Sequence, residues 1–429
     1  MGERIAAFSQ RLSGLQRALL FLLVGAMFIN VAKVALGSRY WILLADVVTG
    51  VLFLWVTITG LLQGRKWLRI EWLFLAFITI GLAELFNPNV PSMVAGIEGF
   101  RRLIFQMLIF FVAVAAATNR EYVIKTVHLI GLCAIPILLY GIKQFFFLSG
   151  FDYALISANT ASIDTWQIFG KTRAFSIFNG PFHLGLFSGF MFWVALTLYA
   201  EKKRAWPITL AVLSVLACLA SLTRSSVVAL AGSIPIVLFF IYRQRRMKIV
   251  WITLIVLVVL ILIGWILTGL FPEVGMLFGS LSSLDDMSQG TRFTSRFEGY
   301  AHGWSLLKSH PAGLGMGSAA DAMEQYFEPA NKIHVTSHNL FLRVALETGW
   351  PGLILFLLMV LLLAQAAFRL RGEGDLPAAM LLSGPLTVIM IAGLTGSSLG
   401  AYPINLLLWA FCGLLCGLAM LLGGTTHGR

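Results

Sequence analysis

Charged residues are scarce in this sequence: Asp, Glu, Lys and Arg make up 12% of its 429 residues, whereas 59% are hydrophobic. Soluble domains carry about a quarter charged and about half apolar residues, so this composition excludes a soluble globular protein. It also excludes a disordered chain, which stays solvated only when its hydrophobicity is low. A helix that crosses a bilayer needs about 20 apolar residues, and the chain is long enough for about a dozen such helices.

Cysteine is equally rare, and common catalytic motifs are missing. Cys133, Cys218, Cys412 and Cys416 all lie in apolar runs without a CxxC pair, so we interpret them as small core residues. The sequence has no Walker loop, no HExxH motif and no Ser/His/Asp grouping. His334 and His338 are four residues apart, but this spacing alone is weak support for a metal site. We therefore predict no metal and no other cofactor.

Apolar runs fill most of the chain and predict its transmembrane helices. They lie at residues 18–36, 40–62, 70–86, 100–117, 122–148, 181–200, 206–222, 225–242, 249–271, 350–368, 376–396 and 403–423. This pattern predicts an all-α polytopic membrane protein with about 12 transmembrane helices, forming a single transmembrane domain over residues 1–429. The first run lacks a small-residue cleavage site before it, so we expect a retained anchor rather than a signal peptide.

The positive charges alternate between the two ends of these runs. With a cytoplasmic N-terminus, the N-terminal segment, every second connection and the C-terminal residue together hold 18 of the 31 Lys and Arg residues. The positive-inside rule then predicts that both termini are cytoplasmic. A net charge of +12 would suggest nucleic acid as the partner of a soluble protein. This distribution indicates membrane lipid instead, and we expect no nucleic-acid partner.

The opposite face has two long connections, at residues 149–180 and 272–337. Within the second, Ser295 to Leu307 is a candidate amphipathic helix, and Gly313 to Gly317 is a candidate tight turn. This loop leads into a helix at His338. Long ordered loops on a rigid scaffold are common places for a site, so we expect the function on this face.

Arg224 lies in a turn of a few residues between two apolar runs. A guanidinium costs about 2.5–3.5 kcal/mol at the middle of a bilayer on insertion scales, and less toward its surface. We favour an anionic partner for Arg224 over the alternative of an arginine that snorkels to the headgroups. Arg292 and Arg296 are four residues apart, a spacing at which like charges repel on a helix unless an anion bridges them. Two arginine forks suit a phosphate, but a salt bridge from Glu298 to Arg296 explains the pair equally well.

His338 follows Ser337 at the expected start of a helix that Gly349 and Pro351 close. We interpret Ser337 as the N-cap and His338 as the first helical residue. A neutral imidazole in a pocket at the membrane surface can take a proton from a hydroxyl, as a general base does. Without further context, a histidine that only forms hydrogen bonds within the loop is the favoured alternative.

The segment from His338 to Gly352 resembles the signature of the O-antigen ligase and polymerase superfamily. His338 and Gly349 stand in the His-x10-Gly arrangement associated with its ligases. Ser295-Arg296, Trp304, Lys308 to Pro311 and Gly313 to Gly317 resemble the large periplasmic loop of that family, and Leu222 to Ser225 resembles its arginine-bearing turn. These matches span about the C-terminal half; the first half matches only in hydropathy.

The resemblance implies a GT-C-like membrane glycosyltransferase of the bacterial inner membrane, with its active site facing the periplasm. It implies a metal-independent, inverting transfer of preassembled glycan from undecaprenyl-pyrophosphate-linked O-antigen to lipid A-core oligosaccharide. His338 would be the general base, and with this resemblance that role is favoured over a histidine that only forms hydrogen bonds within the loop. Arg224, with Arg292 or Arg296, would bind the pyrophosphate, and Arg173 is a weaker candidate for the same role.

Three alternatives remain open. An O-antigen polymerase would use a second lipid-linked glycan as its acceptor, and a protein O-oligosaccharyltransferase would use a protein. A polytopic transporter or flippase is the alternative from a different class. Transporters often contain internal repeats and sites at the middle of the membrane. The sequence shows no convincing repeat, and its candidate residues gather at one face.

Overall fold

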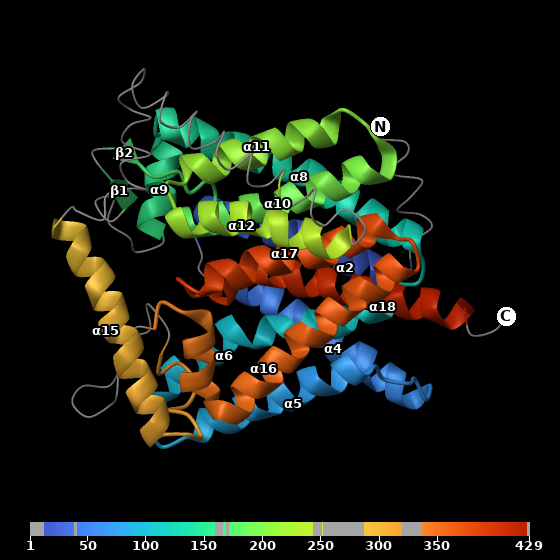
Figure 1. Ribbon diagram of the computed structural model, residues 1–429, viewed down its shortest axis with the longest axis horizontal. Helices are drawn as coiled ribbons and strands as arrows, with labels where there is room; N and C mark the ends of the chain where they lie inside the picture. The colour runs from blue at the N-terminus through green and yellow to red at the C-terminus, as the bar shows by residue number, and fades with distance from the viewer. Residues whose placement is uncertain are drawn as a thin grey trace.

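A computed structural model describes residues 13–37, 41–158, 166–168, 171–242, 251, 287–319 and 337–426. In these residues the chain is almost wholly helical, and most of the helices lie roughly along one direction in a bundle (Figure 1). The described part also contains one short antiparallel pair, β1 (Gln167–Ile168) and β2 (Lys171–Thr172). The prediction of an all-α polytopic membrane protein is therefore confirmed in its helical character.

The α-helices occupy the following residues in chain order: α2 (Gly14–Met27), α3 (Ile29–Ala35), α4 (Trp41–Leu62), α5 (Arg69–Ala83), α6 (Met93–Leu103), α7 (Leu108–Ala116), α8 (Arg120–Phe146), α9 (Gly150–Ala158), α10 (Pro181–Lys202), α11 (Trp206–Ala220), α12 (Arg224–Ile241), α15 (Met287–Ser309), α16 (Leu340–Gly372), α17 (Leu376–Gly393) and α18 (Ile404–Thr426). Three short 3-10 helices join them: η1 (Glu84–Phe86), η2 (Phe105–Met107) and η6 (Ser398–Gly400).

Eight helical segments in the described residues are long and apolar enough to cross a membrane. They are Leu43–Leu62, Met93–Ala116, Arg120–Phe146, Pro181–Lys202, Arg224–Ile241, Leu340–Gly372, Leu376–Gly393 and Ile404–Leu422. The pair α2 and α3, bent by 61°, would bring the number to nine. These helices show a multi-pass membrane protein, but they do not confirm 12 spans.

Three features account for the difference from the predicted 12 spans: one run outside the described residues, the bent pair α2 and α3, and two short helices. Apart from Trp251, the predicted run 249–271 lies outside the described residues, and the other predicted runs fall on one helix or on consecutive helices. However, α5 and α11 have 15 residues each. At 1.5 Å per residue they are about 22 Å long, shorter than the roughly 30 Å of a hydrocarbon core.

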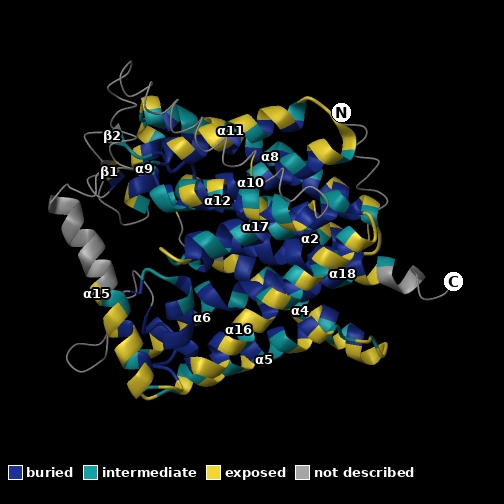
Figure 2. Cartoon of the chain, in the orientation of Figure 1, coloured by how far each residue is buried: buried dark blue, intermediate teal, exposed yellow. Residues whose placement is uncertain are grey.

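The centre of the bundle is formed by α18 and its neighbours. In α18, 83% of the apolar window is buried, against 33% in α4 and α12, which face outward (Figure 2). The helix α18 packs against α7 and α16, and α10 packs against α11 and α17. The helix α18 is apolar on all sides and has no amphipathic stripe, as expected for a helix that its neighbours cover on most sides.

Close backbone contacts at glycines join the segment before α16 to the first part of the chain. Gly317 has φ +80, and a Cβ added at Gly99 would lie 2.4 Å from the backbone nitrogen of Gly317. The amide of Leu314 donates to the carbonyl of Leu346 at 2.6 Å. The turn predicted at Gly313–Gly317 is thus confirmed, and it runs between α6 and α16.

We predict that Gly99→Ala lowers the free energy of unfolding by about 1–3 kcal/mol, because the new methyl group overlaps the Gly317 backbone and the helix must shift. Thermal unfolding of the purified protein in detergent would measure this change. Gly25→Ala is the matched control, since a Cβ there meets nothing within 4 Å. Equal stability of both variants would contradict the close contact.

Candidate functional site

The candidate residues gather at one end of the bundle. The helix α15 and the strand pair β1–β2 lie at one end of the bundle, opposite the C-terminal end of α18 (Figure 1). Arg173 directly follows β2, and Arg224 begins α12. His338 directly precedes the N-cap of α16. The structure therefore places the two arginines and His338 in segments that belong to this end.

Arg224 occupies the first position of α12. The preceding helix ends at Ala220, and the chain reverses through Leu222, whose φ is +48, before Thr223 caps α12. The predicted turn is confirmed. A helix N-terminus carries a partial positive charge on its unpaired amides, so it adds to the charge of Arg224 and favours an anion at this place.

Arg173 reaches the same turn from the long connection before α10. Its Nη2 donates to the Thr223 hydroxyl at 2.8 Å, and its Nε donates to the Ser221 carbonyl at 3.3 Å. The amide of Ala174 also donates to the Ala220 carbonyl at 3.0 Å. The structure thus brings Arg173 and Arg224 to one turn, although 50 residues separate Arg173 from the Thr223 that it contacts.

Gln144 fixes the segment that carries Arg173. Its Oε1 accepts hydrogen bonds from the amides of Phe175 and Ser176, and its Nε2 donates to the Ser176 carbonyl at 2.9 Å. The same Nε2 donates to Asp152 Oδ1 at 2.6 Å. Gln144 and Ser176 are buried, and Ser176 has φ +54, so the chain here needs these bonds to hold its reversal. The sequence analysis missed Gln144, because an isolated Gln in an apolar run carries no recognisable pattern.

Asp152 anchors Gln144 in turn. Its carboxylate accepts hydrogen bonds from Lys143 Nζ and the Tyr140 hydroxyl, both at 2.6 Å. Burial alone would raise the pKa of this carboxyl, but the bonds from Lys143, Tyr140 and Ser149 outweigh it and hold the pKa at about 2. Asp152 is consequently ionised at neutral pH and acts as a permanent acceptor for Gln144.

His338 differs from its expected position. It is not the first helical residue, and Ser337 is not the N-cap: Asn339 caps α16, and its side chain accepts the amide of Leu342 at 3.0 Å. Ser337 instead donates its hydroxyl to the Ala319 carbonyl at 3.1 Å. His338 has φ +36, in the left-handed region, which turns the chain just before the helix begins. Asn competes well with Ser as an N-cap, and the tertiary contact of Ser337 decides between them.

The helix α15 packs over His338. The Tyr300 hydroxyl lies 3.2 Å from both the His338 carbonyl and the Leu394 carbonyl, which share its single proton. The Trp304 and Trp350 rings lie 5.9 Å apart between their centroids. The amphipathic helix predicted over Ser295 to Leu307 is confirmed and is longer than expected.

Arg292 and Arg296 lie two turns and one turn before Tyr300 in α15. Their side chains lie outside the description, so neither the phosphate role nor the pairing of Arg296 with Glu298 is tested.

The break predicted at Gly349 lies in the same helix. Gly349 has φ 67 and ψ −175 within α16, and a Cβ there would meet the Ala312 carbonyl at 2.4 Å. Only glycine fits this backbone and this contact. The first part of α16, between His338 and Gly349, is therefore a short separate arm whose direction the glycine turn determines.

Arg343 is a buried cation that the sequence analysis counted but did not single out. It is 2% exposed, and its Nε pairs with Glu347, which is fully buried, at 3.1 Å. Its Nη1 donates to the Ser397 hydroxyl at 2.8 Å, and Arg102 lies close enough for the two charges to interact. A buried charge needs a partner of opposite charge, and residues four apart face each other on a helix. The presence of Glu347 four residues after Arg343 was therefore the signal in the sequence for a buried ion pair.

A second ion-pair group lies beside Arg343. Arg101 contacts Asp46 at 2.9 Å and Glu98 at 2.8 Å, and Glu98 also faces Arg102 at 3.4 Å. These acidic groups neutralise the cations of α6. This end of the bundle therefore combines paired arginines with the turn of Arg173 and Arg224.

Among the described residues, no three His, Cys, Asp or Glu side chains come together as a metal site. His334 lies outside those residues.

We predict that Gln144→Leu lowers the free energy of unfolding by about 1–3 kcal/mol, because it leaves the buried amides of Phe175 and Ser176 without an acceptor. Chemical or thermal unfolding would measure the loss. The double variant Gln144→Glu with Asp152→Asn should retain more stability than Gln144→Glu alone, since it restores a donor opposite an acceptor. Exposed Gln63→Leu is the control. A double variant no better than Gln144→Glu would refute the direct bond.

One sequence comparison concerns the segment that carries Arg224 and His338. No curated protein matches the chain. Residues 209–357, about a third of the chain, match the family model described as O-Antigen ligase. This match runs from α11 to the middle of α16 and includes Arg224, His338 and Gly349. It confirms the resemblance predicted from the motifs: through residues 209–357, the chain is similar to the O-antigen ligase family.

Proposed function

We propose that this protein is an O-antigen ligase of the bacterial inner membrane. It transfers a preassembled glycan from undecaprenyl pyrophosphate to lipid A-core oligosaccharide, in the biosynthesis of lipopolysaccharide. The active site faces the periplasm, and both chain termini lie in the cytoplasm. The positive-inside distribution of Lys and Arg supports this orientation.

One observation carries the proposal: the family match contains both Arg224 and His338, and these residues stand at the beginnings of two helices at one end of the bundle. A lipid pyrophosphate is a leaving group whose negative charge grows as the glycosyl bond breaks. Fixed cations and helix N-termini stabilise such a charge most when they are already in place. Arg224 at the start of α12, with Arg173 at the same turn, meets this requirement.

The reaction itself needs a base and an anion site. The hydroxyl oxygen of the acceptor sugar attacks the anomeric carbon of the donor glycan, from the face opposite the pyrophosphate. The bond between that carbon and the pyrophosphate oxygen breaks, and its electron pair leaves with undecaprenyl pyrophosphate. His338 takes the proton of the attacking hydroxyl. This displacement inverts the anomeric configuration and requires no metal in principle.

Arg292 and Arg296 complete the proposed pyrophosphate site. They precede Tyr300 in α15, and Tyr300 contacts the His338 carbonyl. A donor bound between the α12 turn and α15 would bring its anomeric carbon near His338. A flat guanidinium can hold two phosphate oxygens at once, which a lysine cannot do.

We predict that His338→Ala lowers the transfer rate by about 10²–10⁴-fold, the usual contribution of general-base catalysis, without changing expression or thermal stability. The measurement is a reconstituted reaction with purified protein, undecaprenyl-pyrophosphate-linked O-antigen and lipid A-core. Glycan on lipid A-core with the wild type identifies a ligase. Longer glycan still attached to undecaprenyl would mean a polymerase. No covalent product from intact substrates and folded protein would favour a transporter.

We further predict that Arg224→Ala impairs use of the donor more than Arg224→Lys, because lysine keeps the charge but loses the two-pronged hydrogen bonds. The measurement is KM for the donor in the same reaction, at constant acceptor concentration. Arg204→Ala, at an exposed position in the connection before α11, is the control. Equal and negligible effects of the two Arg224 substitutions would mean that this side chain serves only as an anchor.

A further inference from the structure

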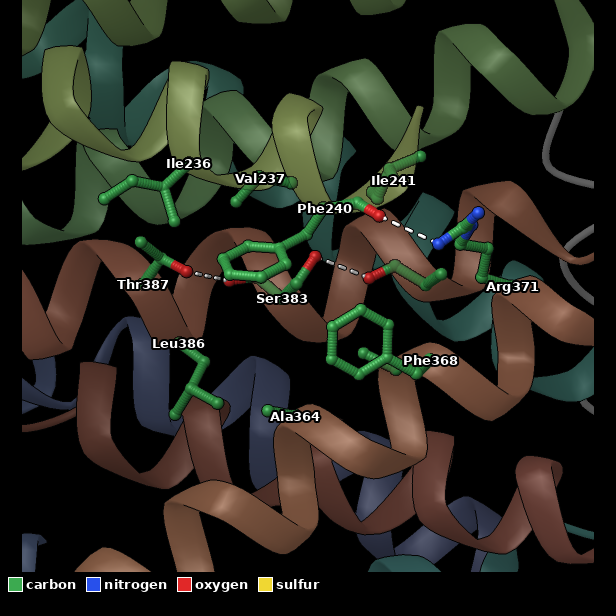
Figure 3. Close-up of a pocket in the computed structure, with 12 residues that line it drawn as sticks. Ile236, Val237, Phe240, Ile241, Ala364, Phe368, Arg371, Ser383, Leu386 and Thr387 are labelled. Atoms are coloured by element: carbon green, nitrogen blue, oxygen red, sulfur yellow. Dashed lines mark hydrogen bonds between the residues drawn. The ribbon is translucent and has the colours of Figure 1, made fainter. Parts of the chain in front are cut away.

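An apolar cavity lies at the other end of α12, far from Arg224. It is about 130 Å³ in volume, and three helices line it. The lining residues share one face on each helix, with Phe240 on α12, Ala364 and Phe368 on α16, and Leu386 on α17 among them (Figure 3). Both α12 and α16 pack against α17, which leaves a groove between them with α17 as its floor.

The walls of this groove have almost no free hydrogen-bonding capacity. The Ser383 hydroxyl donates to the Ala379 carbonyl, and the Thr387 hydroxyl donates to the Ser383 carbonyl, at 2.7 Å each. Phe240 is 45% exposed and Phe368 is 44% exposed, so the groove opens at the outer surface of the bundle. Such a surface suits a hydrocarbon chain and offers a sugar or a nucleotide nothing to bind.

Arg371 lies at one end of the groove, and Thr387 lies at the other (Figure 3). The Nη1 of Arg371 donates to the Phe240 carbonyl at 3.0 Å. This bond holds the guanidinium across the Arg371 end of the groove. The other N–H groups of Arg371 have no partner among the residues that the structure describes. The groove therefore combines an apolar channel with one fixed, half-buried cation at its mouth.

We infer that this groove binds one acyl chain of an anionic phospholipid, with the phosphate of the headgroup at Arg371. Arg369 and Arg371 lie in the last turn of α16, where basic residues meet the charged surface of a bilayer. The lipid comes from the leaflet at this end, which is the cytoplasmic leaflet in the proposed orientation.

The pyrophosphate of the proposed glycan donor does not explain the cation at Arg371. That pyrophosphate belongs at the start of α12, and the groove lies at the other end of this helix, whose 18 residues span about 27 Å. The inference therefore does not depend on the ligase activity, because it rests on the groove and on Arg371 alone.

Native mass spectrometry of the delipidated full-length protein tests the inference, with phosphatidylglycerol and phosphatidylcholine of identical acyl chains as probes. One basic residue near a headgroup is worth about 1 kcal/mol, so the wild type should prefer phosphatidylglycerol about fivefold. Arg371→Gln should abolish this preference. Its neighbour Arg369, which is exposed and does not line the groove, supplies the control Arg369→Gln, which should keep it.

A second pair of variants tests the groove itself. Ala364→Phe fills the channel and should remove the tightest bound lipid of either headgroup. Leu358→Phe, at an exposed position of α16 outside the groove, should not. If Ala364→Phe fails to fold, Arg371→Gln decides the question, because it leaves the apolar packing intact.

Three results would overturn the inference. They are equal affinity of the wild type for both lipids, an unchanged preference in Arg371→Gln, and unchanged lipid binding in a folded Ala364→Phe. The last result would mean that another part of this chain or a second copy of it covers the groove.

Discussion

The whole architecture depends on one constraint: hydrocarbon offers no partner to a peptide N–H or C=O group. Each backbone group at membrane depth must find its partner within the protein, and a helix provides one for nearly every residue. The long apolar runs of this chain accordingly become helices such as α10, α17 and α18. Non-helical backbone is left to the ends of the bundle, and there the polar side chains can meet.

Polar chemistry is consequently concentrated at the end that carries α15. Buried charges there are paired, as Arg343 is with Glu347 and Arg101 is with Asp46. An unpaired buried charge would cost several kcal/mol. The connection before α10 is fixed differently, through the neutral amide of Gln144 and the ionised Asp152. This polar layer forms a rigid support for the turn that holds Arg173 and Arg224, and preorganised cations are what an anionic leaving group requires.

At the end of the bundle opposite α15, ion pairs of a single arginine join several helices. Arg120 joins α8 to Glu201 of α10 and to Asp375 before α17, with contacts of 2.7 Å and 2.6 Å. These ion pairs join three helices at this end of the bundle. The apolar groove at Arg371 lies at this end, and Arg224 lies at the other end of α12. A single helix, α12, thus serves both ends.

The sequence by itself determined the helical class, the positions of most helices and the identity of the arginine turn, because these depend on composition and local pattern. It also identified the family segment, since His338 and Gly349 are close in the chain. Only the tertiary structure decided that Asn339 caps α16, that Arg173 contacts Thr223 and that Gln144 holds the segment that carries Arg173. Those outcomes depend on contacts between residues far apart in the chain, such as Ser337 with Ala319, or Gly99 with Gly317, and no local pattern encodes them.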